Sequence, residues 1–563
     1  MEWLAKLFTK YPEMGVYFAI GLGYVIARLK FRGVGLGTVT SSLLAGIFLG
    51  NFFHVPVSDQ AKAILFLLFL FGIGYSVGPS FFRNLKGEGW RWATLAVFVP
   101  VIGLATAYVV ARFLKLDPGF SAGLLSGSLT ESPVIGTASE AIRGLSLAEE
   151  QKQILIGHIA VADAICYLFG TIGVIWCCSS LGPKLLGIDL RSESRKLEAS
   201  LGIKRSKFGV SSGWQPIGIR AYTIAQDAPV IGQTIAAAER SVPGARLFVE
   251  RIRRNNEIFT PTGTAVFEAG DTVAVLGRTE VLVKVLGPKS SEVPDPELLE
   301  IPVASFDLYV SNKAVAGKTL RELVETFDET RGVLLRGIMR GGKSMPVGTN
   351  VRLERGDVLQ VTGVEQAVEK LAPIVGMKLE PVEEADFSIL GIAVFIGILF
   401  GASLTIPVGH LRITLGTSVG TLLAGLIVGW MHSVRPWFGR MPHEAILFMK
   451  SLGLAAFVAM IGLKAGPIFV HTLKESGYLL FLGGIIVTLT PLITGLYFGR
   501  YILKLNPVLL LGGLAGAQTM IAGVAAVQDK SDSSVSTLGY SYTAAIGHIL
   551  LTTWGTVIVY LMS

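Results

Sequence analysis

The sequence predicts an α-helical polytopic membrane protein, built from two inverted repeats with two small α/β domains inserted between them. Each repeat is expected to hold about five transmembrane helices and one re-entrant hairpin. The chain of 563 residues is 51% apolar and only 16% charged, whereas an ordinary soluble protein is about 25% charged. Its polar residues concentrate between positions 191 and 384, and the apolar flanks repeat the same motifs in the same order.

Each flank contains six apolar segments, and a spanning helix needs about 20 mainly apolar residues. In the first half they lie at 11–30, 36–53, 61–82, 92–113, 119–142 and 153–181. In the second half they lie at 387–408, 413–432, 445–470, 478–500, 506–528 and 538–562. The equal number predicts a duplication.

Four sequence blocks recur in the same order and support the duplication. Residues 37–50 (GTVTSSLLAGIFLG) match 416–429 (GTSVGTLLAGLIVG), and the Gly-x-x-x-Gly-Pro block at 74–79 matches 462–467. The block that begins Leu-Asp-Pro at 116 matches Leu-Asn-Pro at 505, and Gly-Thr at 170 matches Gly-Thr at 555. Any single pair of glycines is weak evidence, because small residues recur wherever membrane helices pack closely. In this alignment Asp163 corresponds to His548, so both are expected to face one central region.

Loop charges predict how the chain crosses the membrane, because cytoplasmic loops are rich in Lys and Arg. The loop with Arg28, Lys30 and Arg32 and the one with Lys86 and Arg91 are placed inside. The polar stretch GSLTESP at 127–133 interrupts segment 119–142, and irregular backbone survives at that depth only beside a cavity or inside protein. If the segment turns back there, each half crosses an odd number of times. The halves are then inverted, the insert is cytoplasmic and the two hairpins meet near the midplane of the inner membrane, as in many secondary transporters.

The insert itself reads as two copies. Residues 230–235 (VIGQTI) match 315–320 (VAGKTL), and each copy later has a Gly-Asp turn, at 270–271 and at 356–357. These copies resemble the TrkA-C (RCK C-terminal) domain of potassium-channel and transporter regulators. The insert is expected to be either a small-ligand sensor or dimerisation module, or a structural spacer. No Gly-x-Gly-x-x-Gly follows a strand, so no NAD is predicted, and no other cofactor or metal site is expected.

Residues that could bind a small organic anion lie at the two hairpins and inside the apolar segments. Ser132 and Pro133 are typical of a helix start, whose free N–H groups suit a carboxylate; Thr519 is expected to cap the matching helix. Ionisable groups deep in a membrane are costly and therefore functional candidates. Lys464 is open to a second interpretation, in which it reaches the outer interface. The predicted binding residues are Ser128, Thr130, Glu131, Ser132, Pro133, Asp163, Lys464, Gln518, Thr519 and His548.

Taken together, these motifs make the chain similar to the aspartate:alanine exchanger family of bacterial membrane proteins over nearly its whole length. The resemblance implies a secondary antiporter that exchanges L-aspartate for L-alanine. Such exchange contributes to the proton-motive force when aspartate is decarboxylated in the cytoplasm. A dicarboxylate carrier, for instance for succinate, and a regulated ion channel are the alternatives. No nucleophile or phosphate-loop motif predicts an enzyme.

The organisation that follows has five parts: a first transmembrane repeat at 1–182, a linker at 183–214, RCK-C-like domains at 215–290 and 298–378, and a second repeat at 385–563. The net charge of +8 is attributed to topology and anionic head groups, so lipids are expected partners and nucleic acid is not. A homodimer is the expected assembly.

Overall fold

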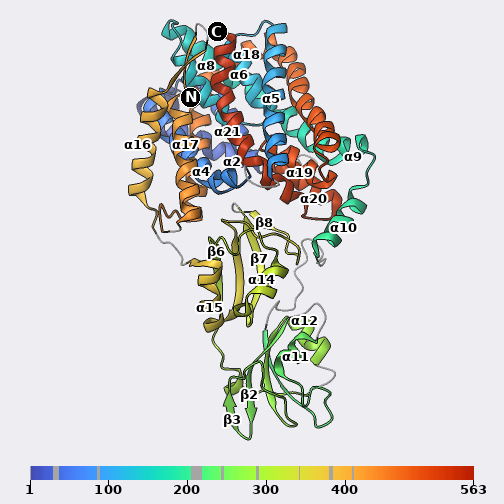
Figure 1. Ribbon diagram of the computed structural model, residues 1–563. Coiled ribbons are helices and arrows are strands. Elements are labelled where there is room, and N and C mark those ends of the chain that lie inside the picture. The colour runs from blue at the N-terminus through green and yellow to red at the C-terminus, as the bar shows by residue number, and fades with distance from the viewer. Residues whose placement is uncertain are drawn as a thin grey trace. The chain divides into compact units, whose positions relative to one another are not determined.

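The computed structural model describes residues 2–29, 37–84, 89–203, 218–241, 246–286, 291–340, 343–379, 384–408, 411–435 and 437–563. The chain forms two compact units, one from residues 1–197 with 381–563 and the other from residues 198–380 (Figure 1). Lys30, Arg32 and Lys86, which were used to predict sidedness, lie outside the described residues, as do positions 204–214 of the predicted linker.

The first half of the membrane unit is a run of helices joined by short connections. They are α1 (Glu2–Lys10), α2 (Pro12–Ala27), α3 (Gly37–Phe52), α4 (Asp59–Asn84), α5 (Trp90–Phe113), α6 (Pro118–Ser128), α7 (Pro133–Arg143), α8 (Glu149–Trp176), α9 (Gly182–Leu185) and α10 (Leu190–Leu201).

The second half follows the same order and adds a small two-stranded ribbon after its first helix. Its elements are α16 (Phe387–Ser403), β11 (Thr405–Val408), β12 (Leu411–Thr414), α17 (Thr417–Val434), α18 (His443–Tyr497), α19 (Pro507–Ala517), α20 (Ile521–Ser531) and α21 (Ser536–Met562).

Seven helical stretches among the described residues are long and apolar enough to cross a membrane, which confirms a helical membrane protein. Two of them lie in α18, which continues through the predicted boundary between segments 445–470 and 478–500. Residues 471–476 (HTLKES) hold neither Gly nor Pro, so nothing in them disfavours a helix. Helices α2, α3 and α16 are apolar but shorter, at 16, 16 and 17 residues.

The two predicted hairpins are broken helices. In the first, α6 ends at Ser128 and α7 begins at Pro133; in the second, α19 ends at Ala517 and α20 begins at Ile521. Each arm has 11 residues, or about 16 Å at 1.5 Å per residue. That is roughly half of a 30 Å hydrocarbon core, which is the length expected for the arms of a re-entrant hairpin.

The duplicated glycine blocks pack across the two halves. A Cβ added at Gly50, which ends the first block, would lie 2.1 Å from the carbonyl oxygen of Leu463 in α18. A Cβ added at Gly429, which ends the second block, would lie 2.1 Å from the carbonyl oxygen of Tyr75 in α4. Helix α3 therefore packs on α18 and α17 packs on α4, so each half supplies one helix to each of two equivalent close crossings.

The helix after each hairpin matches its counterpart in a different register from the predicted one. Gly170 in α8 lies against the carbonyl oxygens of Gly127 and Ser128 at the first hairpin, and Gly547 in α21 lies against those of Gly516 and Ala517 at the second. Gly170 therefore corresponds to Gly547 and not to Gly555. The predicted match of Asp163 with His548 is wrong. Asp163 lies seven residues before Gly170, and Tyr540 lies seven residues before Gly547. Their backbone carbonyl oxygens approach Gly127 and Gly516 respectively, so Asp163 matches Tyr540.

The insert folds into two sheets of the same topology. The first sheet has the order β3-β2-β4-β1-β5 and the second β8-β7-β9-β6-β10, with all neighbouring strands antiparallel. The first set comprises β1 (Gly218–Thr223), α11 (Ile235–Arg240), β2 (Leu247–Arg254), β3 (Glu257–Phe259), β4 (Thr272–Gly277), α12 (Thr279–Val281), β5 (Ser291–Glu292) and α13 (Pro296–Leu299). The second comprises β6 (Val303–Val310), α14 (Leu320–Thr326), β7 (Val333–Arg340), β8 (Lys343–Met345), β9 (Val358–Val364), α15 (Glu365–Val375) and β10 (Gly376–Leu379).

The repeated Gly-Asp turn of the insert has a structural role. Asp271 is buried and receives two hydrogen bonds of 2.8 Å from the Arg254 guanidinium, and Asp357 receives bonds of 2.7 and 2.8 Å from Arg340. Each aspartate also accepts the backbone N–H three residues before it. A buried bidentate pair of this kind ties the turn to the end of the neighbouring strand, which explains why both copies keep the motif.

Candidate functional site

The two hairpin tips contain a residue of the same type in the same unusual conformation. Thr130 and Thr519 both have φ of 56°, in the left-handed region. A β-branched residue is strained there, and such strain persists only where the surrounding structure imposes it. The two threonines occupy equivalent positions in the repeats, so the strained turn is a shared feature of both hairpins.

Hydrogen bonds join the two tips directly. The Thr130 hydroxyl donates to the Gln518 carbonyl oxygen at 3.0 Å, and the Thr519 hydroxyl donates to a Glu131 carboxylate oxygen at 2.6 Å. Residues almost 400 positions apart in the chain thus form one polar site inside an apolar unit, as was predicted for hairpins that meet.

Glu131 is the centre of this polar site, and its side chain is 1% exposed. The Thr552 hydroxyl donates to its other carboxylate oxygen at 3.2 Å, and Nδ1 of His548 lies 3.2 Å from that same oxygen. Both partners come from α21 of the second half. A buried carboxylate is tolerated when such groups surround it. Residues of the second half therefore stabilise Glu131, which belongs to the first half.

Gln518 places an unsatisfied amide at the same tip. The side chain is fully buried, and neither its oxygen nor its nitrogen has a hydrogen-bond partner among the described residues. The Ser128 hydroxyl is also buried and has no hydrogen-bond partner among the described residues. The Ser128 backbone carbonyl, by contrast, accepts a hydrogen bond from the Thr488 hydroxyl at 2.9 Å. A buried polar group left unpaired costs about 1–3 kcal/mol, so these atoms are suited to a polar ligand.

The prediction that free backbone N–H groups at the start of α7 are available to a carboxylate is wrong. The backbone N–H groups of Val134 and Ile135, expected to be free, already donate to the carbonyl oxygens of Glu131 and Ser132. Ser132 is the N-cap residue and Pro133 begins the helix, as predicted, but the Ser132 side chain makes no capping bond. Thr519 is not a cap either, since α20 begins at Ile521 after Met520. The charged group at the tips is therefore the Glu131 carboxylate, which accepts from the Thr519 hydroxyl.

Two predicted residues lie away from the tips. Asp163 accepts a 2.5 Å hydrogen bond from Ser126 between α6 and α8. Lys464 donates to Asp59, at the start of α4, at 2.9 Å. The structure therefore joins Thr130, Glu131, Gln518, Thr519 and His548 at the tips. Ser128, Ser132 and Pro133 belong to the same break in the first hairpin.

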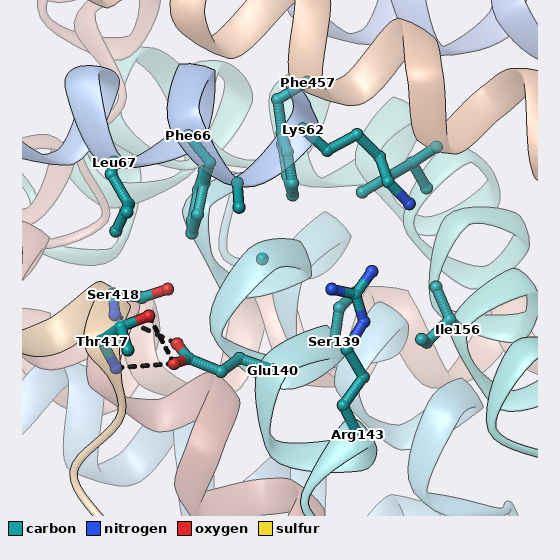
Figure 2. A pocket seen from close by; sticks show the side chains of 13 residues that line it. Lys62, Phe66, Leu67, Ser139, Glu140, Arg143, Ile156, Thr417, Ser418 and Phe457 are labelled. Atoms are coloured by element: carbon teal, nitrogen blue, oxygen red, sulfur yellow. Dashed lines mark hydrogen bonds between the residues drawn. The ribbon is translucent and has the colours of Figure 1, made fainter. Parts of the chain in front are cut away.

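A cavity of about 160 Å³ lies beside α7, between the first hairpin and helices α4, α8, α17 and α18 (Figure 2). It is lined by Lys62, Ala63, Phe66, Leu67, Gly136, Ser139, Glu140, Arg143, Ile156, Thr417, Ser418, Phe457 and Ile461. Lys62, Arg143 and Glu140 are not among the binding residues predicted from the sequence. Lys62 falls inside a predicted spanning segment, which is the signal that could have identified it.

Glu140 closes one side of this cavity by binding the start of α17. Its carboxylate accepts from the Thr417 N–H at 2.6 Å, the Thr417 hydroxyl at 2.6 Å and the Ser418 N–H at 3.1 Å (Figure 2). A carboxylate at a helix N-terminus satisfies free N–H groups and the positive end of the dipole. Glu140 thus joins the first hairpin to the second half.

Comparisons with known proteins agree with this architecture. The family described as a predicted permease membrane region, of the aspartate–alanine exchanger type, matches residues 15–182 and 389–560, and the TrkA-C domain matches 219–286 and 308–376.

Similar proteins cover the chain almost end to end. An uncharacterized transporter of Bradyrhizobium diazoefficiens is 47% identical over 92% of this chain and its own full length. Uncharacterized transporters of Shewanella oneidensis and Bordetella parapertussis are 35% and 37% identical, covering 100% and 99% of this chain and 100% and 98% of their own lengths. This chain therefore belongs to the aspartate:alanine exchanger family of membrane transporters, with two TrkA-C domains between its membrane halves.

Proposed function

We propose that the protein is a secondary antiporter that exchanges L-aspartate for L-alanine across the inner membrane. The observation that carries this proposal is the single polar site formed by both hairpin tips, with Glu131 held by Thr519, Thr552 and His548. A site built at the joint of two repeats can be exposed to either side when one part moves against the other.

The groups at the tips match an amino acid in type. The Glu131 carboxylate can accept an ammonium group or carry a proton, and the unpaired Gln518 amide and Ser128 hydroxyl can donate to a carboxylate. Inward aspartate for outward alanine moves one net negative charge into the cell. With cytoplasmic decarboxylation, which consumes a proton, this exchange contributes to the proton-motive force.

Counterflow in proteoliposomes tests the exchange. Vesicles loaded with L-alanine should take up labelled L-aspartate faster than empty vesicles, and uptake should develop an inside-negative potential that a voltage-sensitive dye reports. Equal uptake into loaded and empty vesicles would refute the substrate pair.

A dicarboxylate carrier is the second candidate, and one observation favours it. Three cations, Lys62, Arg143 and Lys464, surround the single carboxylate of Asp59, an arrangement that would attract an anion without requiring an ammonium group. In competition against labelled aspartate, a carrier of this kind should be inhibited by succinate and not by alanine. The antiporter should be inhibited by alanine and not by succinate.

A further inference from the structure

A cluster of three cations on one acid stands at the edge of the cavity beside α7. The Oδ1 atom of Asp59 lies 2.5 Å from Nζ of Lys62, 2.9 Å from Nζ of Lys464 and 3.2 Å from the Arg143 guanidinium. Lys62 shares α4 with Asp59, whereas Arg143 ends α7 and Lys464 lies in α18. Both halves of the protein therefore contribute charge to this point.

The positive charge is not balanced by the acids nearby. Glu140 also lines the cavity, but its carboxylate is bound by the first residues of α17. Counting both Asp59 and Glu140 against Lys62, Arg143 and Lys464 leaves one positive charge in excess among the described residues of this cluster.

Burial makes that excess significant. Lys62 is 3% exposed, and a buried ammonium without full compensation is costly. Its amine and the Arg143 guanidinium both extend into the cavity (Figure 2). The cavity volume of about 160 Å³ is roughly ten times the 10–15 Å³ that one water requires, so a small organic anion fits.

Asp59 is far more exposed than the lysine that it binds. Its side chain is 46% exposed, whereas that of Lys62 is 4% exposed, so the acid can turn toward water while the lysine stays buried. An exchange of Asp59 for another carboxylate would keep the charge-assisted hydrogen bonds of the cations.

We propose that this cavity is a carboxylate-binding site, separate from the hairpin tips, in which Asp59 is an internal counter-ion that the ligand displaces. Helix α7 connects the two sites, since it runs from Pro133 at the tip to Arg143 at the cavity, about 15 Å at 1.5 Å per residue. The site would load the organic anion before it reaches the tips. That the ligand is an organic carboxylate rests on the proposed function. An inorganic anion such as chloride would be attracted by the same three cations.

Thermal stability of the full-length protein in detergent, titrated with succinate, acetate or chloride, tests the site, because a ligand of the folded state raises stability by mass action. Lys62→Gln and Arg143→Gln should each weaken the apparent affinity roughly tenfold, the value of one charge-assisted hydrogen bond. Lys62→Arg should restore it. Asp59→Asn should strengthen anion binding by removing the competing carboxylate.

The matched control is Lys152→Gln, which removes a cation paired with Glu149 in the first turn of α8, outside the cavity lining. It should bind anions as the unchanged protein does. Asp59→Asn should bind anions more tightly and Lys62→Gln less tightly than the unchanged protein. A loss of folding stability alone would lower the melting temperature of both variants, but it would not change their anion affinities in opposite directions.

The two anion sources and the two proposals give different results. Stabilisation by succinate and acetate identifies a carboxylate site, whereas stabilisation by chloride alone identifies an inorganic anion and overturns the loading role. Equal affinities in Lys62→Gln, Arg143→Gln and Lys152→Gln overturn the site altogether. Failure of the exchange assay with intact anion binding would count only against the proposed function.

Discussion

Glu131 illustrates how one residue can depend on a distant part of the chain. Its neighbours Thr130 and Ser132 belong to the same turn, but the groups that bind its carboxylate are Thr519, His548 and Thr552 of the second half. A lone carboxylate in an apolar segment is a functional candidate from sequence alone. Its partners were not all foreseen, because Thr552 carries no charge and resembles any membrane-helix threonine.

Glu131→Gln is expected to reduce exchange at least tenfold with little loss of thermal stability. Glutamine keeps the size and can still accept from Thr519, but it removes the charge that would pair with an ammonium group or carry a proton, and hydrogen bonds to charged groups contribute roughly 1.5–3 kcal/mol. Counterflow rates and melting temperature are the measurements. Glu150→Gln, at an exposed position in the first turn of α8, is the control, and full exchange by Glu131→Gln would contradict this role.

At the scale of elements, the close helix crossings explain why the duplicated blocks are rich in glycine. Gly50 and Gly429 end equivalent blocks and each lies against a carbonyl oxygen of the opposite half. The repeat is visible in the sequence, but the helix that each block faces is not, because a Gly-x-x-x-Gly block suits any close crossing. The same ambiguity displaced the register of α21, where Gly547 and Gly555 are both available two turns apart.

Gly50→Ala is expected to destabilise the membrane unit by roughly 1–3 kcal/mol, the usual cost of overpacking. The added Cβ would lie 2.1 Å from the Leu463 carbonyl oxygen, a backbone atom that cannot move without shifting α18. Unfolding in detergent, followed by circular dichroism, measures the change. At Gly21 an added Cβ meets nothing within 4 Å, so Gly21→Ala should be neutral or slightly stabilising; equal effects at both positions would rule out the steric explanation.

At the scale of the whole molecule, the chain separates into a membrane unit and an insert with hydrophobic clusters of its own. Within the insert, the Arg331 guanidinium holds the two TrkA-C domains together through hydrogen bonds to Glu239 at 2.7 and 3.2 Å and to the Val249 carbonyl at 3.0 Å. Glu250, in the bulge of β2 beside this contact, is buried with one carboxylate oxygen unpaired among the described residues. Burial raises the pKa of Glu250 above its ordinary value, although the charge of Arg331 opposes this.

The raised pKa predicts a pH dependence. A carboxyl whose pKa is higher in the folded state contributes stability below its unfolded pKa, near 4.5, and loses that contribution as pH rises through the folded value. Glu250→Gln should therefore stabilise fragment 198–380 at pH 7, and the difference should vanish as pH falls toward 4.5. Urea unfolding over this pH range is the measurement, with exposed Glu325→Gln as control; a difference that grows on acidification would have the wrong sign.

Local physical chemistry determined much of this protein from its sequence. Long apolar runs predict membrane helices, and the GSLTESP break ends one helix and starts another. In the insert, the threonines of VIGQTI and VAGKTL cap helices. Such caps, like the Gly-Asp turns, depend mainly on neighbouring residues. Only the tertiary structure decided that α3 packs on α18, that Tyr540 and not His548 matches Asp163, and that Lys464 joins Asp59. These contacts join residues hundreds of positions apart, and which helix surfaces meet depends on packing over whole faces, which no local pattern records.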